Sequence, residues 1–316
     1  GIARSLVVSN QNGSGLRDEL CVMHAFDSKE DANKPYHLRG QSILNSYDTT
    51  LIRARRQYDS RGPQMLLART RPAKFNKNDE DIEVAKLEYY QNQHTVEKAP
   101  PIVASILNEL HKEVHPHYLF MGSFGTGGKK VGSMGSVTDY IARLANSTTC
   151  IVKHWRPVPK DGEIATFLVA IDDSPASMKA LDQIFVLAKP HDKIIGITVS
   201  RHEGPKDKEI MEHARSKIAS FGANAGPDAP EAEVHWKKLE EGQGNAAEHL
   251  IRFSDELEAD YLVLGSFNTA HGAPGRDSMI SLGSTALYCS QNCKCHAIVV
   301  KPPREKGDYQ HSTSFS

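Results

Sequence analysis

The chain has 316 residues, of which 39% are hydrophobic and 24% charged, and its formal net charge at pH 7 is -1. This is the composition of a globular protein long enough for two domains, and a charge near zero argues against nucleic acid or an anionic membrane as a partner. With no apolar run of membrane-spanning length, no signal peptide and only five cysteines, we expect a reduced, cytoplasmic protein. The chain starts at Gly1 rather than Met, so we expect further residues before it or processing.

The first half is predicted to alternate strands and helices, with its opening strand missing. Residues 20–26 and 65–68 are short apolar runs that predict strands, and they match the second and third strands of the second half. Residues 41–58 and 100–115 have helical spacing. Residues 2–8 allow two interpretations, the remnant of a first helix or a displaced strand.

The first half ends in a strand, a loop, a helix and a second strand. A strand is predicted to begin at Tyr118, a glycine-rich loop covers 122–136, and residues 150–153 form a closing apolar run. Before them, residues 70–98 are polar and rich in Asn, Lys, Asp and Glu, so we interpret them as an insertion.

The second half shows the same alternation more clearly. Residues 167–171 are a continuous apolar run, as expected of a strand covered on both faces. After the turn at Asp172 a helix is predicted from Ala176, with Ser174 as its cap and Pro175 at its first position. The remaining predicted elements are strands at 194–199, 234–239, 261–264 and 297–301, and helices at 208–221, 245–258 and after Gly283. Strand–helix alternation of this kind predicts a parallel, doubly wound sheet.

Three blocks of sequence recur in the same order in both halves. Residues 118–126 return as residues 261–269, an offset of 143, and both copies contain Gly-Ser-Phe. Residues 134–137 are echoed by residues 282–285. Each half then closes with a short apolar run that ends in lysine. This period is that of a domain duplication, and it is too long for a solenoid.

The glycine-rich loop of the first half is the main candidate site. It leaves the carboxyl end of a strand and enters a helix, where open parallel sheets bind ligands. Glycines let the backbone approach phosphate oxygens, and free N–H groups at a helix start favour negative charge. Ser136 and Thr138 could add hydroxyl donors, and Lys129 or Lys130 a cation. The loop fits neither a Walker A motif nor a dinucleotide fingerprint, so phosphate binding and a flexible connector both remain open.

On these motifs the chain resembles the universal stress protein family. The family's ATP-binding signature, Gly-x2-Gly-x9-Gly-Ser/Thr, is matched by Gly122, Gly125, Gly135 and Ser136, and with Val137 these residues would line the triphosphate. The resemblance implies an adenine nucleotide as ligand, ATP above all, with or without Mg²⁺. It also implies two tandem Rossmann-like domains of the adenine nucleotide alpha hydrolase type.

The second half departs from the signature. Asp172 matches the aspartate that helps the family to hold the nucleoside, although it and Asp173 could equally cap the following helix. Asn268 replaces the second loop glycine, and fourteen residues instead of nine precede Gly283, so loss of binding is favoured over a remodelled loop. The candidate nucleotide-binding residues are Gly122, Gly125, Thr126, Gly135, Ser136 and Val137 in the first half, and Asp172, Gly265, Gly283 and Ser284 in the second.

The closing strands suggest how the halves are joined. Members of the family commonly dimerise by antiparallel pairing of their fifth strands. Residues 151–153 and 298–300 could pair in this way within one chain, as a pseudo-dimer that buries two sheet edges. We expect domains at 1–159 and 160–302 and a polar tail at 303–316.

Cysteines and histidines offer no second site. Cys289, Cys293, Cys295 and His296 lack a further ligand pair, so structural thiols are favoured over a metal centre. Fifteen histidines form no recognisable catalytic grouping.

Two functions follow from the sequence. The first is an adenine-nucleotide-binding sensor or regulator of the stress-response type, with at most weak ATP hydrolysis or autophosphorylation. The alternative is a structural or adaptor subunit, for example of a cytoskeletal assembly, in which a protein partner holds the polar insertion and tail. Their composition favours disorder in the isolated protein.

Overall fold

The computed structural model of the chain describes residues 19–21, 64–66, 117–123, 130–131, 134–145, 147–154, 156–160, 162–172, 174–226, 229–240, 242, 244–266 and 282–301. The chain divides into two compact units, residues 7–116 and residues 117–316 with the first six residues. The elements predicted at 2–8, 41–58 and 100–115, the insertion and the tail lie outside the described residues.

The smaller unit contains a parallel pair of strands. These are β1 (Glu19–Cys21) and β2 (Gln64–Leu66), in register with Leu20 opposite Met65. Both lie where the sequence predicts strands. Their parallel pairing is the arrangement that the equivalent strands adopt in the second half of the chain.

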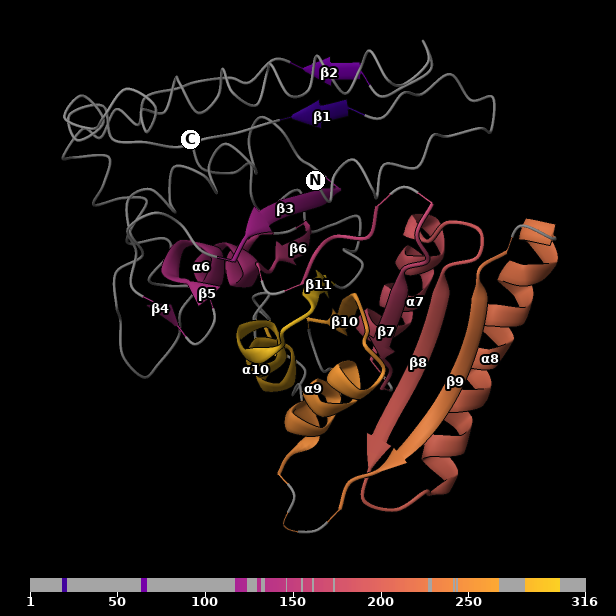
Figure 1. Cartoon of the computed structure of the whole chain (residues 1–316). Helices are drawn as coiled ribbons and strands as arrows, with labels where there is room; N and C mark the ends of the chain where they lie inside the picture. Colours follow the sequence, from indigo (N-terminus) through magenta and orange to yellow (C-terminus); the bar gives the residue numbers. More distant parts are fainter. Residues whose placement is uncertain are drawn as a thin grey trace, which may run out of the picture. The chain divides into compact units, whose positions relative to one another are not determined.

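The larger unit is built on a seven-stranded sheet of order β3-β6-β11-β10-β7-β8-β9 (Figure 1). Every neighbouring pair is parallel except β6 and β11. The strands are β3 (Tyr118–Gly122), β6 (Thr148–Val152), β7 (Thr166–Ala170), β8 (Lys193–Ser200), β9 (Glu231–Lys238), β10 (Tyr261–Gly265) and β11 (His296–Val300). A separate two-stranded hairpin, β4 (Lys130–Val131) with β5 (Met134–Gly135), lies within the first glycine-rich loop.

Five helices accompany these strands in the described part of the larger unit. They are α6 (Ser136–Leu144), α7 (Pro175–Leu187), α8 (Pro205–Ala225), α9 (Ala246–Glu256) and α10 (Ser284–Asn292). As predicted, Ser174 caps α7 by accepting a hydrogen bond from the Ser177 N–H at 3.1 Å, with Pro175 in the first turn. None of the described helices combines the length and the apolar character needed to cross a membrane.

Helix α8 is longer than the sequence prediction at both ends. It starts at Pro205, where the Asp207 carboxylate accepts from the Gly204 N–H at 2.8 Å, and it ends before Gly226, whose φ is 69°. A proline at the first position is favourable at a helix start, and a glycine readily adopts the positive φ found after the last turn. The predicted limits missed them because the apolar residues occupy only the central turns.

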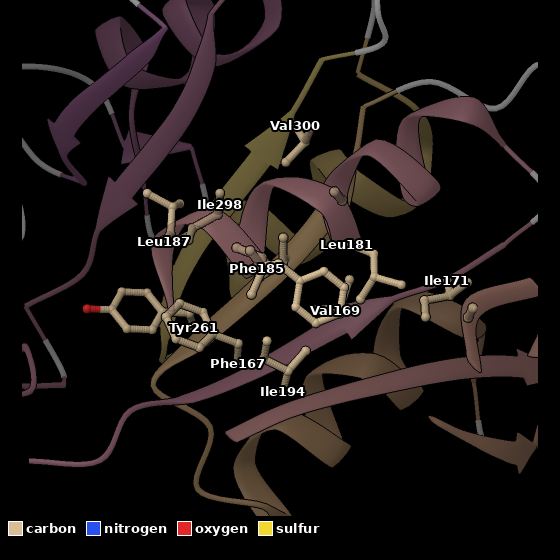
Figure 2. Packing of buried hydrophobic residues seen from close by; sticks show 14 of the residues in the cluster. Phe167, Val169, Ile171, Leu181, Phe185, Leu187, Ile194, Tyr261, Ile298 and Val300 are labelled. Atoms are coloured by element: carbon tan, nitrogen blue, oxygen red, sulfur yellow. The ribbon is translucent and has the colours of Figure 1, made fainter. Parts of the chain in front are cut away.

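Both faces of the sheet are covered, which explains the continuous apolar strands. On one face, α7 and α8 pack over a cluster that includes Phe167, Val169 and Ile298 (Figure 2). Phe167 and Tyr261 stack there with ring centroids 4.7 Å apart. On the other face, α9 and α10 cover Leu168, Leu262 and the rest of a second cluster.

The antiparallel pairing of β6 with β11 has an internal symmetry. Tyr118 of β3 is opposite Thr148 of β6, and in the same way Tyr261 of β10 is opposite His296 of β11. In this correspondence Cys150 is equivalent to Ile298, and these two residues face each other at the centre of the pairing. The flanking pairs, Ala297 with Ile151 and Val299 with Thr149, exchange with one another. The β3–α6–β6 and β10–α10–β11 segments are therefore related by a local twofold axis.

Candidate functional site

The order of the strands reverses between β10 and β7. From β7 the chain continues to β8 and β9 on one side, and β10 then returns to the other side of β7, next to β11. In open parallel sheets ligands bind at such a reversal, beyond the carboxyl ends of the strands. The loops after β7 and β10 both begin there, so the geometry places Asp172 and Gly265 at the ends of adjacent strands.

The loop after β7 is an internally bonded turn. Asp172 is exposed, and its Oδ1 accepts from the Ser174 N–H at 2.8 Å. The Ser177 hydroxyl donates to the Asp172 carbonyl at 2.8 Å and closes the turn. Asp172 therefore supports the start of α7, which is the structural alternative left open by the sequence. Its role toward a nucleoside stays a prediction, and Asp173 lies outside the described residues.

The loop after β10 starts with a glycine that α7 requires. A Cβ on Gly265 would lie 2.7 Å from the Ser177 nitrogen and 2.8 Å from the Ala176 carbonyl carbon. At the far end of the loop, the nearest described atom to a Cβ on Gly283, neighbouring residues apart, would be the Ser266 oxygen, at 3.9 Å. Packing against α7 therefore explains Gly265, whereas no contact among the described residues requires glycine at position 283.

Between these glycines, Ser266 is a residue that sequence reasoning missed as a site candidate. Its N–H donates to the Val300 carbonyl and its own carbonyl accepts from the Gly283 N–H, both at 2.8 Å. Its side chain is fully buried, and its hydroxyl has no hydrogen-bond partner among the described residues. Helix α10 then begins at Ser284 without a side-chain cap, so first-turn N–H groups are left for another acceptor. The Gly-Ser-Phe sequence that recurs in both halves is the sequence feature that could have identified this serine.

The first loop has the same framework. The Ser123 N–H donates to the Val152 carbonyl at 2.8 Å, and the Ser123 carbonyl accepts from the Gly135 N–H at 2.6 Å. Helix α6 begins at Ser136, followed by Val137, and Gly135 again provides no side-chain cap. The hydroxyl of Thr138, considered as a phosphate donor, instead donates to the Gly122 carbonyl at 2.8 Å. Gly125 and Thr126 lie outside the described residues.

The cysteines of the larger unit belong to the core. Cys150, Cys289, Cys293 and Cys295 are buried free thiols. Burial raises the pKa of Cys289 to about 12, and the Cys293 thiol donates to the Cys295 carbonyl at 3.3 Å. No group of three His, Cys, Asp or Glu side chains within the described part of the chain has the geometry to hold a metal ion.

A parallel sheet with helices on both faces and two loops at its order reversal defines a doubly wound, Rossmann-like α/β protein. The model of the universal stress protein family matches residues 163–301, and this part of the chain is a member of that family.

Solved structures of universal stress proteins also resemble the chain. A putative universal stress protein from Pseudomonas aeruginosa UCBPP-PA14 is 16% identical, with a TM-score of 0.45 over 90% of this chain and 94% of its own. A family member from Arabidopsis thaliana with AMP bound is 16% identical, with a TM-score of 0.31 over 46% and 97%. A universal stress protein in complex with cAMP is 23% identical, with a TM-score of 0.32 over 44% and 97%. No curated protein matches the chain.

Proposed function

We propose that the chain is an adenine-nucleotide-binding universal stress protein of the cytoplasm that acts as a sensor or regulator. The observation that supports this best is the shared framework of the two loops. Each leaves a strand, is tied to the neighbouring strand by a serine N–H and leads into a helix whose N-terminus lacks a side-chain cap. Such an arrangement suits phosphate oxygens, and the AMP- and cAMP-bound relatives carry ligands of this class.

In this proposal the first loop is the main site and the second is degenerate. The first retains Gly122, Gly125 and Gly135 at the family spacing, with Thr126, Ser136 and Val137 beside them, and ATP with or without Mg²⁺ is the ligand. In the second loop Gly265 is used for packing against α7. In this proposal any turnover is limited to weak ATP hydrolysis or autophosphorylation.

We further propose that the chain is a tandem protein, with domains at 1–159 and 160–302 forming an intrachain pseudo-dimer. The local twofold relation around Cys150 and Ile298 supports this, because a duplicated domain pairing with itself would produce it. The parallel pairing of β1 with β2 is also what a first domain of this fold would contain.

The first prediction concerns ATP affinity measured by isothermal titration calorimetry. We expect the chain to bind ATP and Gly135→Val to weaken binding at least about tenfold, or by about 1.4 kcal/mol, since a branched side chain would block approach to the α6 N-terminus. Gly283→Val is the matched variant at the second loop, where the nearest described atom to an added Cβ, neighbouring residues apart, is 3.9 Å away. It should leave the affinity unchanged.

Two outcomes would contradict this assignment. Equal loss in both variants would show that the second loop is also a working site. No ATP binding by the wild type would remove nucleotide binding altogether. The chain would then be better explained as an adaptor whose polar segments, residues 70–98 and 303–316, are held by a protein partner.

A further inference from the structure

Two buried lysines occupy equivalent positions at the ends of the paired strands. Lys153 directly follows β6 and Lys301 directly follows β11, and their relative exposures are 1% and 2%. Lysine is almost never this buried without a partner. Because a buried lysine occurs at the equivalent position of both segments, packing of its aliphatic chain alone does not explain it.

Each lysine donates to a helix that belongs to the other segment. The Nζ of Lys301 donates to the carbonyls of Ala142 and Arg143 in α6, at 2.7 and 3.2 Å. The Nζ of Lys153 donates to the carbonyl of Ser290 in α10, at 2.7 Å. Ala142 and Ser290 are themselves equivalent under the local twofold, so the two connections are reciprocal.

These carbonyls are among the four at a helix end that have no intrahelical donor. In α6 the Ile141 carbonyl accepts from the Ala145 N–H, and Lys301 satisfies the next two. In α10 the Cys289 carbonyl accepts from the Cys293 N–H, and Lys153 satisfies the Ser290 carbonyl. The amino group also lies at the end of the helix where the dipole favours a cation.

The other ends of α6 and α10 are the N-termini that open from the two glycine-bearing loops. We propose that Lys153 and Lys301 are reciprocal positioning residues. Lys301 of the second segment fixes α6, which begins at the first loop, and Lys153 of the first segment fixes α10, which begins at the second loop. The arrangement of each loop then depends on the strand end of the other segment. The functional meaning of the loops rests on the proposed nucleotide binding, but the connections themselves do not.

A contact between the two helices fits this arrangement. Asp139 of α6 accepts from Gln291 of α10 at 2.8 Å, and it also holds Arg143 of its own helix at 2.9 Å. The two helices therefore meet near the axis as well as being connected through the lysines. A shift of either helix would disturb the buried lysine that the other segment supplies.

Amide hydrogen exchange followed by mass spectrometry tests the proposal without any nucleotide. In Lys301→Met, which keeps the apolar stem but has no donor, we expect peptides covering residues 134–145 to exchange about tenfold faster, because the Ala142 and Arg143 carbonyls lose their hydrogen-bond donor. Peptides covering residues 282–293, on the same segment as Lys301, should be unchanged. Lys153→Met should give the opposite pattern, with faster exchange in residues 282–293 only.

Lys294→Met is the matched control. Lys294 lies on the surface and pairs with Asp255, so its loss should leave both peptides unchanged. The proposal is overturned by any of three results: faster exchange only in the segment that carries the substitution, equally faster exchange in both peptides, or no change in either. If Lys301→Met does not fold, Lys301→Gln, whose shorter side chain cannot reach both carbonyls, is judged by the same pattern. ATP is absent from this experiment, so a negative exchange result does not bear on nucleotide binding. Conversely, a chain that does not bind ATP should still show the expected exchange pattern.

Discussion

Replacing Gly265 with alanine is expected to lower the free energy of unfolding by about 3 kcal/mol, the upper range for inserting a group into a packed interior. The added Cβ would lie 2.7 Å from the Ser177 nitrogen and 2.8 Å from the Ala176 carbonyl carbon, both backbone atoms of the first turn of α7. Backbone cannot give way as the end of a flexible side chain can. Either α7 moves off the sheet, which disturbs the Asp172 turn, or β10 shifts against β7. Urea unfolding followed by circular dichroism measures the loss.

Gly283→Ala is the control at the other end of the same loop. Among the described residues its Cβ would approach nothing closer than the Ser266 oxygen at 3.9 Å, and its φ of -57° is open to any residue. The stabilisation from reduced chain entropy and the poorer capping by alanine should nearly cancel, leaving a change within about 0.5 kcal/mol. Similar losses in the two variants would mean that close contact with α7 is not what requires glycine at position 265.

A glycine of the sequence motif can serve close packing within the fold or the approach of a ligand, and the contrast between Gly265 and Gly283 distinguishes these two roles. Gly122 and Gly265 occupy the same place at the ends of equivalent strands, and both match the first glycine of the family signature. At Gly265 the structure supplies a packing reason that is independent of any ligand. A half that had lost nucleotide binding would therefore keep this glycine. The more informative residue is Gly283, because no contact with the described part of the chain requires glycine there.

Much of the larger unit could be predicted from sequence because its signals are local. The apolar runs that became β7 and β10, and the Ser174-Pro175 start of α7, each depend on a few adjacent residues. An antiparallel pairing of 151–153 with 298–300 was predicted from the resemblance. β6 and β11 do pair antiparallel, but through residues 149–151 and 297–299.

What the sequence could not supply were interactions whose partners carry no sequence signal. Lys153 and Lys301 were visible as the last residues of two repeated runs, but their acceptors are backbone carbonyls that any residue would provide. The Thr138 hydroxyl was considered as a donor to phosphate because nothing in the sequence identifies the Gly122 carbonyl as its acceptor. The buried, unpartnered hydroxyl of Ser266 likewise follows from its surroundings in space.

The stability of the chain is expected to rise with pH, relative to Lys301→Met, by about 3 kcal/mol between pH 7 and pH 9.5. Burial lowers the pKa of Lys301 to about 7, whereas a lysine in the unfolded chain titrates near about 10.4. Between these values the unfolded state binds a proton that the folded state does not, so each pH unit adds about 1.4 kcal/mol to the free energy of unfolding. Burial also lowers the pKa of Lys153, which adds to the wild-type slope in the same direction but cancels in the difference.

Comparing wild type with Lys301→Met at each pH isolates this effect, because the buried thiols and tyrosines that ionise in alkali are common to both proteins. Below pH 7 the wild type carries the full cost of a buried ammonium, and removing it can be neutral or stabilising even though two carbonyls of α6 lose their donor. Above pH 9 the neutral amine still donates to these carbonyls without that cost, so the wild type should be the more stable protein.

Urea titrations from pH 6 to pH 9.5 measure the difference, with Lys294→Met as an exposed-lysine control whose difference curve should stay flat. A flat curve for Lys301→Met as well would mean that Lys301 keeps its ordinary pKa and that solvent reaches its amino group. In that case the connection between α6 and the second segment would be far weaker than the buried geometry implies.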